Sequence, residues 1–113
     1  MNALILLLSM FRADAKSNGL TLPETKIVFN VRNLDSENAF GIATYTDYGW
    51  LIEIDSATYY MDSQEVIKRV VYHELGHALL ELREGKGIMN HKRILHDITD
   101  KELKQLFRWE PLQ

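Results

Sequence analysis

The stretch "VVYHELGHALLELREGKGIMNH", residues 70–91, contains two histidines four residues apart, with a glutamate directly after the first. Residues four apart in a helix project from the same face, so His73 and His77 would lie side by side. Glu74 is rotated by about 100° from His73 around the helix, which places it beside a metal ion held by the two imidazoles. The spacing therefore predicts a helix that carries a zinc site, with Glu74 next to the metal rather than bound to it.

These three residues suit the activation of a water molecule. A zinc ion lowers the pKa of a bound water toward about 7, and a neighbouring carboxylate can then act as a general base. The chain contains no cysteine, so any further ligand of such an ion must come from His, Asp or Glu. We therefore predict that His73 and His77 bind Zn²⁺ and that Glu74 is the catalytic base.

The residues around this motif predict a long helix that packs against other elements. Asp62, with Glu65 three residues later, fits a capping box at the start of the helix, and Gly85 and Gly87 are expected to end it. An apolar stripe with helical spacing runs between these limits: Ile67, Val71, Leu75, Ala78 and Leu82. We expect this stripe to pack on a β-sheet.

Two histidines do not complete a catalytic zinc site, which normally has three protein ligands and one open position. The sequence offers five candidates for the third ligand: Glu84, His91, His96, Asp97 and Glu102. In a straight helix, Glu84 would lie about 10.5 Å beyond His77 along the axis, too far to share the metal. Glu84 could bind only if the chain left the helix near Leu82 and turned back, which Gly85 and Gly87 would permit. Spacing alone therefore leaves the third ligand open.

The sequence "VVYHELGHALL", followed by a glycine-rich turn and "GIMN", resembles the metzincin clan of zinc peptidases. It is most similar to matrixin-like members and to small bacterial and phage relatives. The resemblance implies that a third ligand follows the helix and that Met89 lies in a tight turn beneath the metal, the Met-turn. It extends over about residues 26–107. Within this range, "AFGIATY" resembles the clan's antiparallel edge strand, which pairs with extended substrate. The segment "GWLIEIDSATYY" resembles the strand that follows it, and "ITDKELKQLF" resembles the closing helix.

Two positions depart from the matrixin pattern H-E-x-x-H-x-x-G-x-x-H. Leu80 stands in place of the glycine and Arg83 in place of the third histidine, and arginine cannot bind a metal because it stays protonated. Some small relatives are one residue longer in this stretch, and that register gives the third ligand position to Glu84. The resemblance thus implies a zinc shell of His73, His77 and Glu84, in which the carboxylate would weaken the polarising power of the metal.

The rest of the chain predicts an α+β domain. An apolar pattern with helical spacing at the N-terminus predicts a helix that stops at "NG". "KIVFNVR" alternates as a strand does, and "AFGIATYT" and "GWLIEID" predict a hairpin with its turn at "DYG". A last helix should begin near Thr99, with acidic residues in its first turn. Together with the resemblance, this predicts one zincin-like domain over residues 1–113: N-terminal helix, mixed twisted sheet with an antiparallel edge strand, long active-site helix, Met-turn and C-terminal helix.

Composition and charge limit the partners of the protein. A net charge of −3 and a pI near 5.8 argue against a broad nucleic-acid surface, which needs clustered Lys and Arg. The N-terminal apolar run is too short to span a membrane. Residues 1–15 could also be a signal peptide, but a basic segment before the apolar run is missing. We therefore favour a structural helix and a cytoplasmic protein over a secreted one, and we expect a monomer that binds neither nucleic acid nor membrane.

Three functional hypotheses follow. The first is a zinc-dependent metalloendopeptidase that binds a peptide or protein substrate in extended form along residues 40–45, by β-augmentation. The second is a gluzincin-like peptidase in which Glu102 is the third ligand. This class of hypothesis also includes compact H-E-x-x-H peptidases that cleave one regulatory partner, such as a repressor. The third is a non-catalytic pseudoenzyme that keeps zinc for stability. The intact Glu74 favours a catalytic site, because a structural zinc site has no use for a general base.

Overall fold

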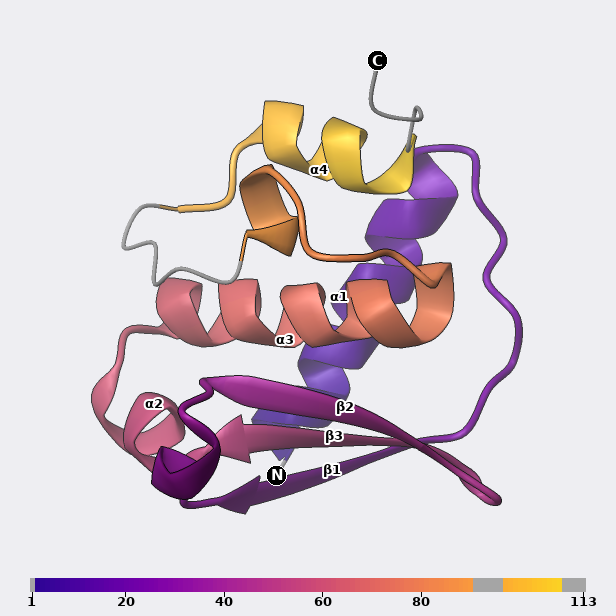
Figure 1. Ribbon diagram of the computed structural model, residues 1–113. Coiled ribbons are helices and arrows are strands. Elements are labelled where there is room, and N and C mark those ends of the chain that lie inside the picture. The colour runs from indigo at the N-terminus through magenta and orange to yellow at the C-terminus, as the bar shows by residue number, and fades with distance from the viewer. Residues whose placement is uncertain (1, 91–96, 109–113) are drawn as a thin grey trace.

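The computed structural model describes residues 2–90 and 97–108. Helices and a small sheet follow one another in the order α1 (Asn2–Ser17), β1 (Ile27–Arg32), η1 (Asp35–Glu37), β2 (Gly41–Thr46), β3 (Gly49–Asp55), α2 (Ser56–Met61), α3 (Gln64–Leu80), η2 (Gly87–Met89) and α4 (Asp100–Phe107). Figure 1 shows α3 lying between the sheet on one side and η2 and α4 on the other. The arrangement confirms the α+β class.

The sheet has three strands in the order β1-β3-β2. The β1 strand pairs with β3 in parallel, whereas β2 pairs with β3 in antiparallel fashion. The predicted hairpin is confirmed: Thr46 and Gly49 are paired at its end, so two residues form the turn. Because β2 is an edge strand and packs beside α3, its free edge lies next to the histidine helix (Figure 1).

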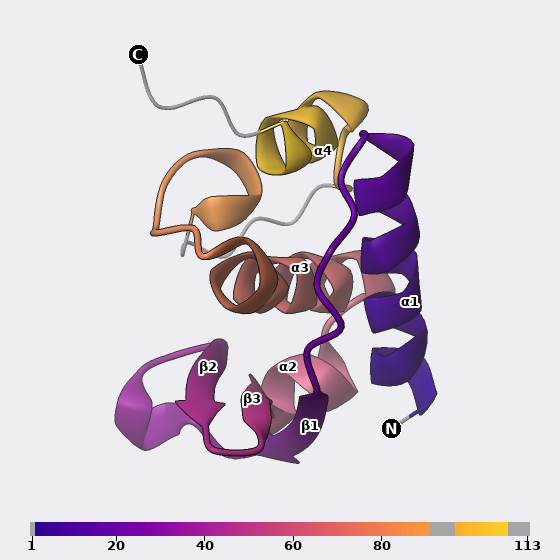
Figure 2. The same ribbon diagram turned by 90° about the vertical axis from the view of Figure 1, so that its right-hand side faces the viewer.

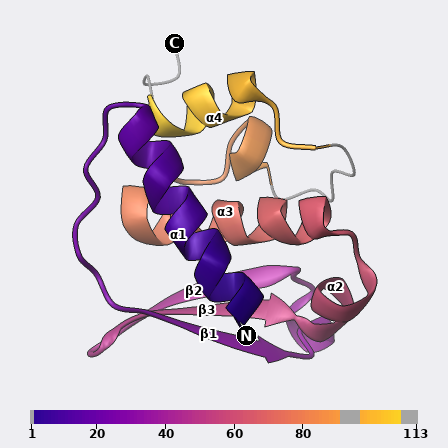
Figure 3. The same ribbon diagram turned by 180° about the vertical axis from the view of Figure 1, so that it is seen from behind.

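The core lies between α3 and its neighbours. All five residues of the predicted stripe are buried: Ile67, Val71, Leu75, Ala78 and Leu82. The N-terminal helix, α1, crosses α3, in front of it in the view of Figure 3, and buries Leu4, Phe11 and Ala15. The Phe11 ring meets that of Tyr72 edge-on, with 5.0 Å between centroids. The Tyr72 hydroxyl donates to a carboxylate oxygen of Asp14 at 2.6 Å, so α1 is fixed to α3 by both packing and a hydrogen bond.

Three sequence predictions about helix limits are wrong. The N-cap of α3 is Ser63, whose hydroxyl accepts from the Val66 N–H, and not Asp62. The helix ends at Leu80, and its C-cap Glu81 adopts the left-handed conformation with φ 54°, before Gly85 is reached. The segment after Asp55 forms the helix α2 rather than a continued strand. Each error lies at an element boundary, where local chemistry offers several equivalent residues.

The closing helix begins as predicted. Thr99 caps α4 and forms a full capping box with Glu102, which satisfies backbone N–H groups at the helix start. Leu106 and Phe107 are buried, so α4 covers the outer side of α3 and the end of α1 (Figure 2). Within residues 2–90 and 97–108, no helix combines the length and apolar character needed to cross a membrane.

Candidate metal centre

The structure brings together three side chains that the sequence analysis had connected. The Nε2 atoms of His73 and His77 are 3.1 Å apart. One carboxylate oxygen of Glu84 lies 2.8 Å from the first and 2.9 Å from the second. Within the described part of the chain, His73, His77 and Glu84 form the group of side chains that could hold a metal ion. The Nε2 atoms of the two histidines and one carboxylate oxygen of Glu84 therefore converge, so that one metal ion could contact all three atoms.

Backbone carbonyls fix the orientation of both imidazole rings. His73 Nδ1 lies 2.8 Å from the carbonyl oxygen of Ile88, and His77 Nδ1 lies 2.6 Å from that of Leu82. A carbonyl oxygen can only accept, so each Nδ1 carries the proton and donates it. In a neutral imidazole, the Nε2 atom then presents its lone pair. This is the arrangement of metal-binding histidines, in which the second ring nitrogen is held by an outer hydrogen bond.

The chemistry of the three atoms fits a cation. Two imidazole lone pairs and one carboxylate oxygen would repel one another at 2.8–3.1 Å unless a positive charge lies among them. Ligands of a tetrahedral zinc ion at 2.0–2.1 Å are about 3.3–3.4 Å apart, so a small outward movement would accommodate the ion. The donor set is also chemically suitable, since two histidines with one glutamate form a known catalytic zinc shell.

A sharp turn after α3 returns Glu84 to the histidines. Glu81 takes a left-handed conformation, and the N–H of Leu82 donates to the Gly76 carbonyl at 3.1 Å. The chain then reverses along the helix, so Glu84 lies beside His73 although eleven residues separate them. The sequence analysis required the chain to leave the helix near Leu82 and turn back for Glu84 to bind, and named Gly85 and Gly87 as residues that would permit this. The chain leaves the helix at Glu81, one residue before Leu82.

Glu74 lies beside the cluster without joining it. Its nearer carboxylate oxygen is 4.0 Å from His73 Nε2, and its side chain is buried. Burial raises the pKa of Glu74, and the nearby His73 and His77 oppose that rise. A carboxyl with a raised pKa is suited to accept and return a proton near neutral pH, which is the role that the sequence predicted for it.

Glu84 is more accessible. About half of its side-chain surface is exposed, whereas His73 is buried. Burial raises the pKa of Glu84, but in the metal-free protein hydrogen bonds from His73 and His77, donated when an imidazole also carries a proton on Nε2, outweigh this effect and hold the pKa below the ordinary value. Glu84 is therefore ionised at neutral pH, as a metal ligand must be.

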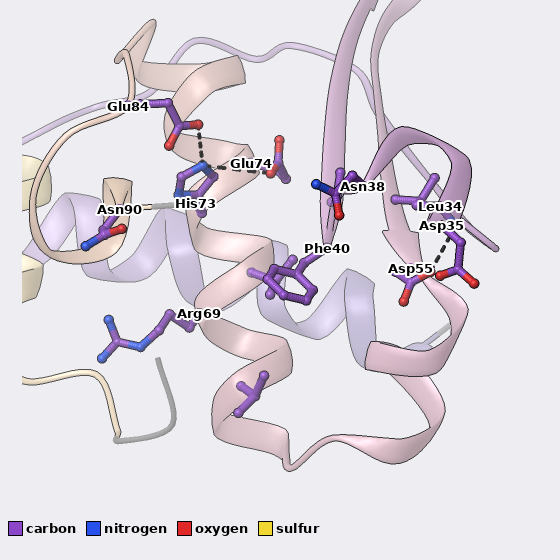
Figure 4. Close-up of a pocket in the computed structure, with 14 residues that line it drawn as sticks. Leu34, Asp35, Asn38, Phe40, Asp55, Arg69, His73, Glu74, Glu84 and Asn90 are labelled. Carbon is purple, nitrogen blue, oxygen red and sulfur yellow. Dashed lines mark hydrogen bonds and ion pairs between the residues drawn. The ribbon is translucent and has the colours of Figure 1, made fainter. Parts of the chain in front are cut away.

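The cluster lies between two open cavities. One, of about 640 Å³, is lined by apolar residues such as Phe40 and Val70, and Figure 4 shows His73, Glu74 and Glu84 gathered at one end of it. The other, of about 600 Å³, reaches along β2 past Ala43 and Trp50 to His77. Gly41, Glu74 and Glu84 line both cavities. An extended molecule lying along β2 could therefore pass over the three-residue cluster.

The other candidate ligands are placed differently. Glu102 forms an ion pair with Arg69, with N–O distances of 2.7 and 2.9 Å. The Arg69 hydrogen bond lowers the Glu102 pKa to about 2. Asp97 is exposed, and its backbone oxygen accepts from Arg69. Neither acid belongs to the group that could hold a metal. His91 and His96 lie outside the described residues.

Met89 lies against the histidine helix, whereas its place beneath a metal, which the resemblance implies for a Met-turn, stays a prediction. It is buried within the short helix η2. A Cβ atom placed on Gly76 would lie 2.5 Å from the Met89 sulfur, so Gly76 permits close packing of η2 on α3. The preceding residue, Ile88, supplies the carbonyl that holds His73. The turn thus packs on α3 through the Met89 side chain and holds His73 through the Ile88 carbonyl oxygen.

The sequence analysis missed three contributors to this centre. The carbonyls of Leu82 and Ile88 are backbone groups, so no residue type could have indicated them. Arg69 could have been found from the sequence, since it lies four residues before His73 and therefore on the same helix face. It lines the larger cavity and connects α3 to Glu102 of α4. Arg69 therefore fixes the closing helix to the wall of the site.

Comparisons of the chain with protein-family models, with curated proteins and with solved structures found no match. Inferences about function therefore depend on the residues and geometry of this centre.

Proposed function

We propose that the protein is a metal-dependent peptidase whose centre consists of His73, His77 and Glu84, with Glu74 as general base. The observation that carries this proposal is the convergence of two oriented imidazoles and one carboxylate beside a second, buried carboxylate. The open cavities on both sides would admit a substrate. A metal needed only for stability would not require this access, since structural sites tend to be closed.

A bound Zn²⁺ would polarise the scissile carbonyl and lower the pKa of the attacking water. The residues of the chain have separate tasks around it. The Leu82 and Ile88 carbonyls hold the imidazoles in the tautomer that exposes Nε2. Glu74 would take the proton from the attacking water and pass it to the leaving amine. Burial favours this step, because a carboxyl with a raised pKa holds the transferred proton more readily.

The free edge of β2 supports a peptide as the substrate. The Asp55 N–H donates to the Phe40 carbonyl, and hydrogen-bonded pairs alternate along an antiparallel ladder. By this alternation, the backbone groups of Gly41, Ala43 and Tyr45 point away from β3. An extended peptide could add to this edge as a further strand and place one of its carbonyls over the cluster. The metzincin resemblance implies the same use of this strand, and membership of that clan is part of the proposal.

The gluzincin-like alternative is less well supported, because Glu102 is engaged with Arg69 and Thr99. The proposed enzyme would accept a repressor or another single protein as substrate, provided that the protein presents an extended segment to β2.

Replacement of Glu74 by Gln tests the proposal. The amide has nearly the same shape but cannot act as a base, so peptide cleavage should fall by about 10²–10⁴-fold. Zinc binding should be retained, because Glu74 is not a ligand. Cleavage of a mixture of unstructured peptides would be followed by mass spectrometry, and metal content by elemental analysis. Glu65→Gln, a change of the same kind in the first turn of α3, is the control and should leave both unchanged. Undiminished cleavage by Glu74→Gln would refute the mechanism.

A further inference from the structure

The Glu74 carboxylate packs directly against strand β2. A Cβ atom placed on Gly41 would lie 2.9 Å from Glu74 Cγ and 3.2 Å from its Oε2 atom. It would also lie 3.0 Å from a methyl group of Val70, one turn earlier in α3. These separations are shorter than ordinary carbon–carbon contacts of 3.5–4.0 Å. Only a residue without a side chain can therefore occupy position 41 while Glu74 keeps its place.

Backbone conformation does not explain this glycine. The glycines with positive φ are Gly19, Gly49 and Gly87, and Gly41 is not among them. Any residue could adopt the backbone angles of position 41, so its requirement for glycine comes from the space that Glu74 and Val70 occupy. A glycine in a strand also destabilises the strand. At position 41, the close packing of β2 on Glu74 and Val70 offsets this loss of stability.

A backbone group of the same strand acts on Glu74. The backbone of Ala43 lowers the pKa of the Glu74 carboxyl, against the larger opposite effect of burial. Ala43 is one of the residues whose backbone groups point away from β3. The free edge of β2 therefore faces the general base as well as the site that a bound peptide would occupy.

We propose that Gly41 is a positioning residue for Glu74, and that β2 holds the general base as well as the substrate. This rests on the proposed function, because it assigns the carboxylate a catalytic task. Gly41 acts by leaving room for Glu74 between β2 and α3. It is not a ligand. A side chain at position 41 should therefore displace the base and leave the metal cluster in place.

Gly41→Ala tests this with a kinetic measurement. A displacement of the base by about 1 Å should lower kcat by roughly 100-fold, while KM and the Kd for Zn²⁺ stay within about threefold of the wild-type values. Gly85→Ala is a matched control. An added Cβ there meets nothing closer than 3.9 Å, and its φ is not positive, so kcat should not change. A Gly41→Ala protein with wild-type kcat would overturn the proposal, and so would one that fails to bind zinc.

A stability cycle tests the same contact without catalysis. Gly41→Ala should lower the Tm of the metal-free protein by several degrees, because the added methyl group overpacks the contact between β2 and α3. In a Glu74→Ala background, the same change should lower Tm by less than half as much. An undiminished effect there would show that Glu74 does not occupy the space, and would overturn the proposal. If the wild-type protein cleaved no peptide, the proposed function would fail, whereas this cycle would still decide whether Gly41 sets the position of Glu74.

Discussion

Replacement of Glu84 by Gln removes the negative charge from the third ligand while preserving its shape. The Glu84 carboxylate lies 2.8 and 2.9 Å from the two imidazole Nε2 atoms, so a metal ion bound between them would touch it. The side chain is about half exposed, and water therefore screens its charge strongly. The change isolates the electrostatic contribution of Glu84 to metal affinity.

The expected loss of zinc-binding free energy can be worked out from this screened charge. At a metal–oxygen distance of about 2.1 Å, a unit negative charge and a divalent cation attract by about 4 kcal/mol even in the dielectric of water. The amide oxygen, or a water molecule, would recover part of this energy. We expect a net loss of about 3 kcal/mol, which weakens zinc binding by roughly 100-fold. The two oriented histidines should still hold the ion, with one metal per chain.

Competition titration against a chromophoric chelator measures this Kd, and elemental analysis gives the stoichiometry. Glu81→Gln is the matched control, because Glu81 lies in the same turn and is exposed. It loses the same charge without facing the imidazoles, so its Kd should stay within about threefold of wild type, the effect of one screened surface charge. A Glu84→Gln protein that bound zinc as tightly as the control would refute Glu84 as a ligand.

Two further changes test the supports of the centre. Glu102→Gln should destabilise the protein by about 3 kcal/mol at pH 7, because it leaves Arg69 buried without its ion-pair partner. The Arg69 hydrogen bond lowers the Glu102 pKa to about 2, so this difference should be full above about pH 4.5 and shrink as pH falls toward 2. Urea unfolding at several pH values would measure it, and a constant difference down to pH 2 would contradict the cause given. Gly76→Ala should cost about 1–2 kcal/mol in the same assay, because overpacking against the Met89 sulfur outweighs the better helix propensity of alanine. A gain in stability would show that Met89 moves aside freely.

The sequence predicted the centre well where its signals are periodic. The four-residue spacing of His73 and His77 and the apolar stripe of α3 are both consequences of helix geometry. Both survive in the structure because the whole helix is regular from Gln64 to Leu80. The hairpin and the Thr99 cap could also be predicted, because turn residues and capping residues act on the backbone next to them in sequence.

The position of Glu84 could not be decided from spacing. Its approach to His73 depends on a left-handed residue at position 81, and a glutamate gives no sign of that conformation, which glycine usually supplies. The resemblance to small metzincins, rather than the helix period, pointed to Glu84. The Arg69–Glu102 ion pair is likewise invisible in sequence because 33 residues separate its partners. Tertiary packing, and not local propensity, determines both.

The identity of the metal ligands is the central claim, and a crystal structure with anomalous data collected at the zinc edge tests it most directly. We predict a single zinc peak within about 2.0–2.2 Å of His73 Nε2, His77 Nε2 and a carboxylate oxygen of Glu84, with the Glu74 carboxylate next to the ion but not bound to it. A peak that lacks Glu84, or that has Glu102 or another residue in its place, would contradict the account.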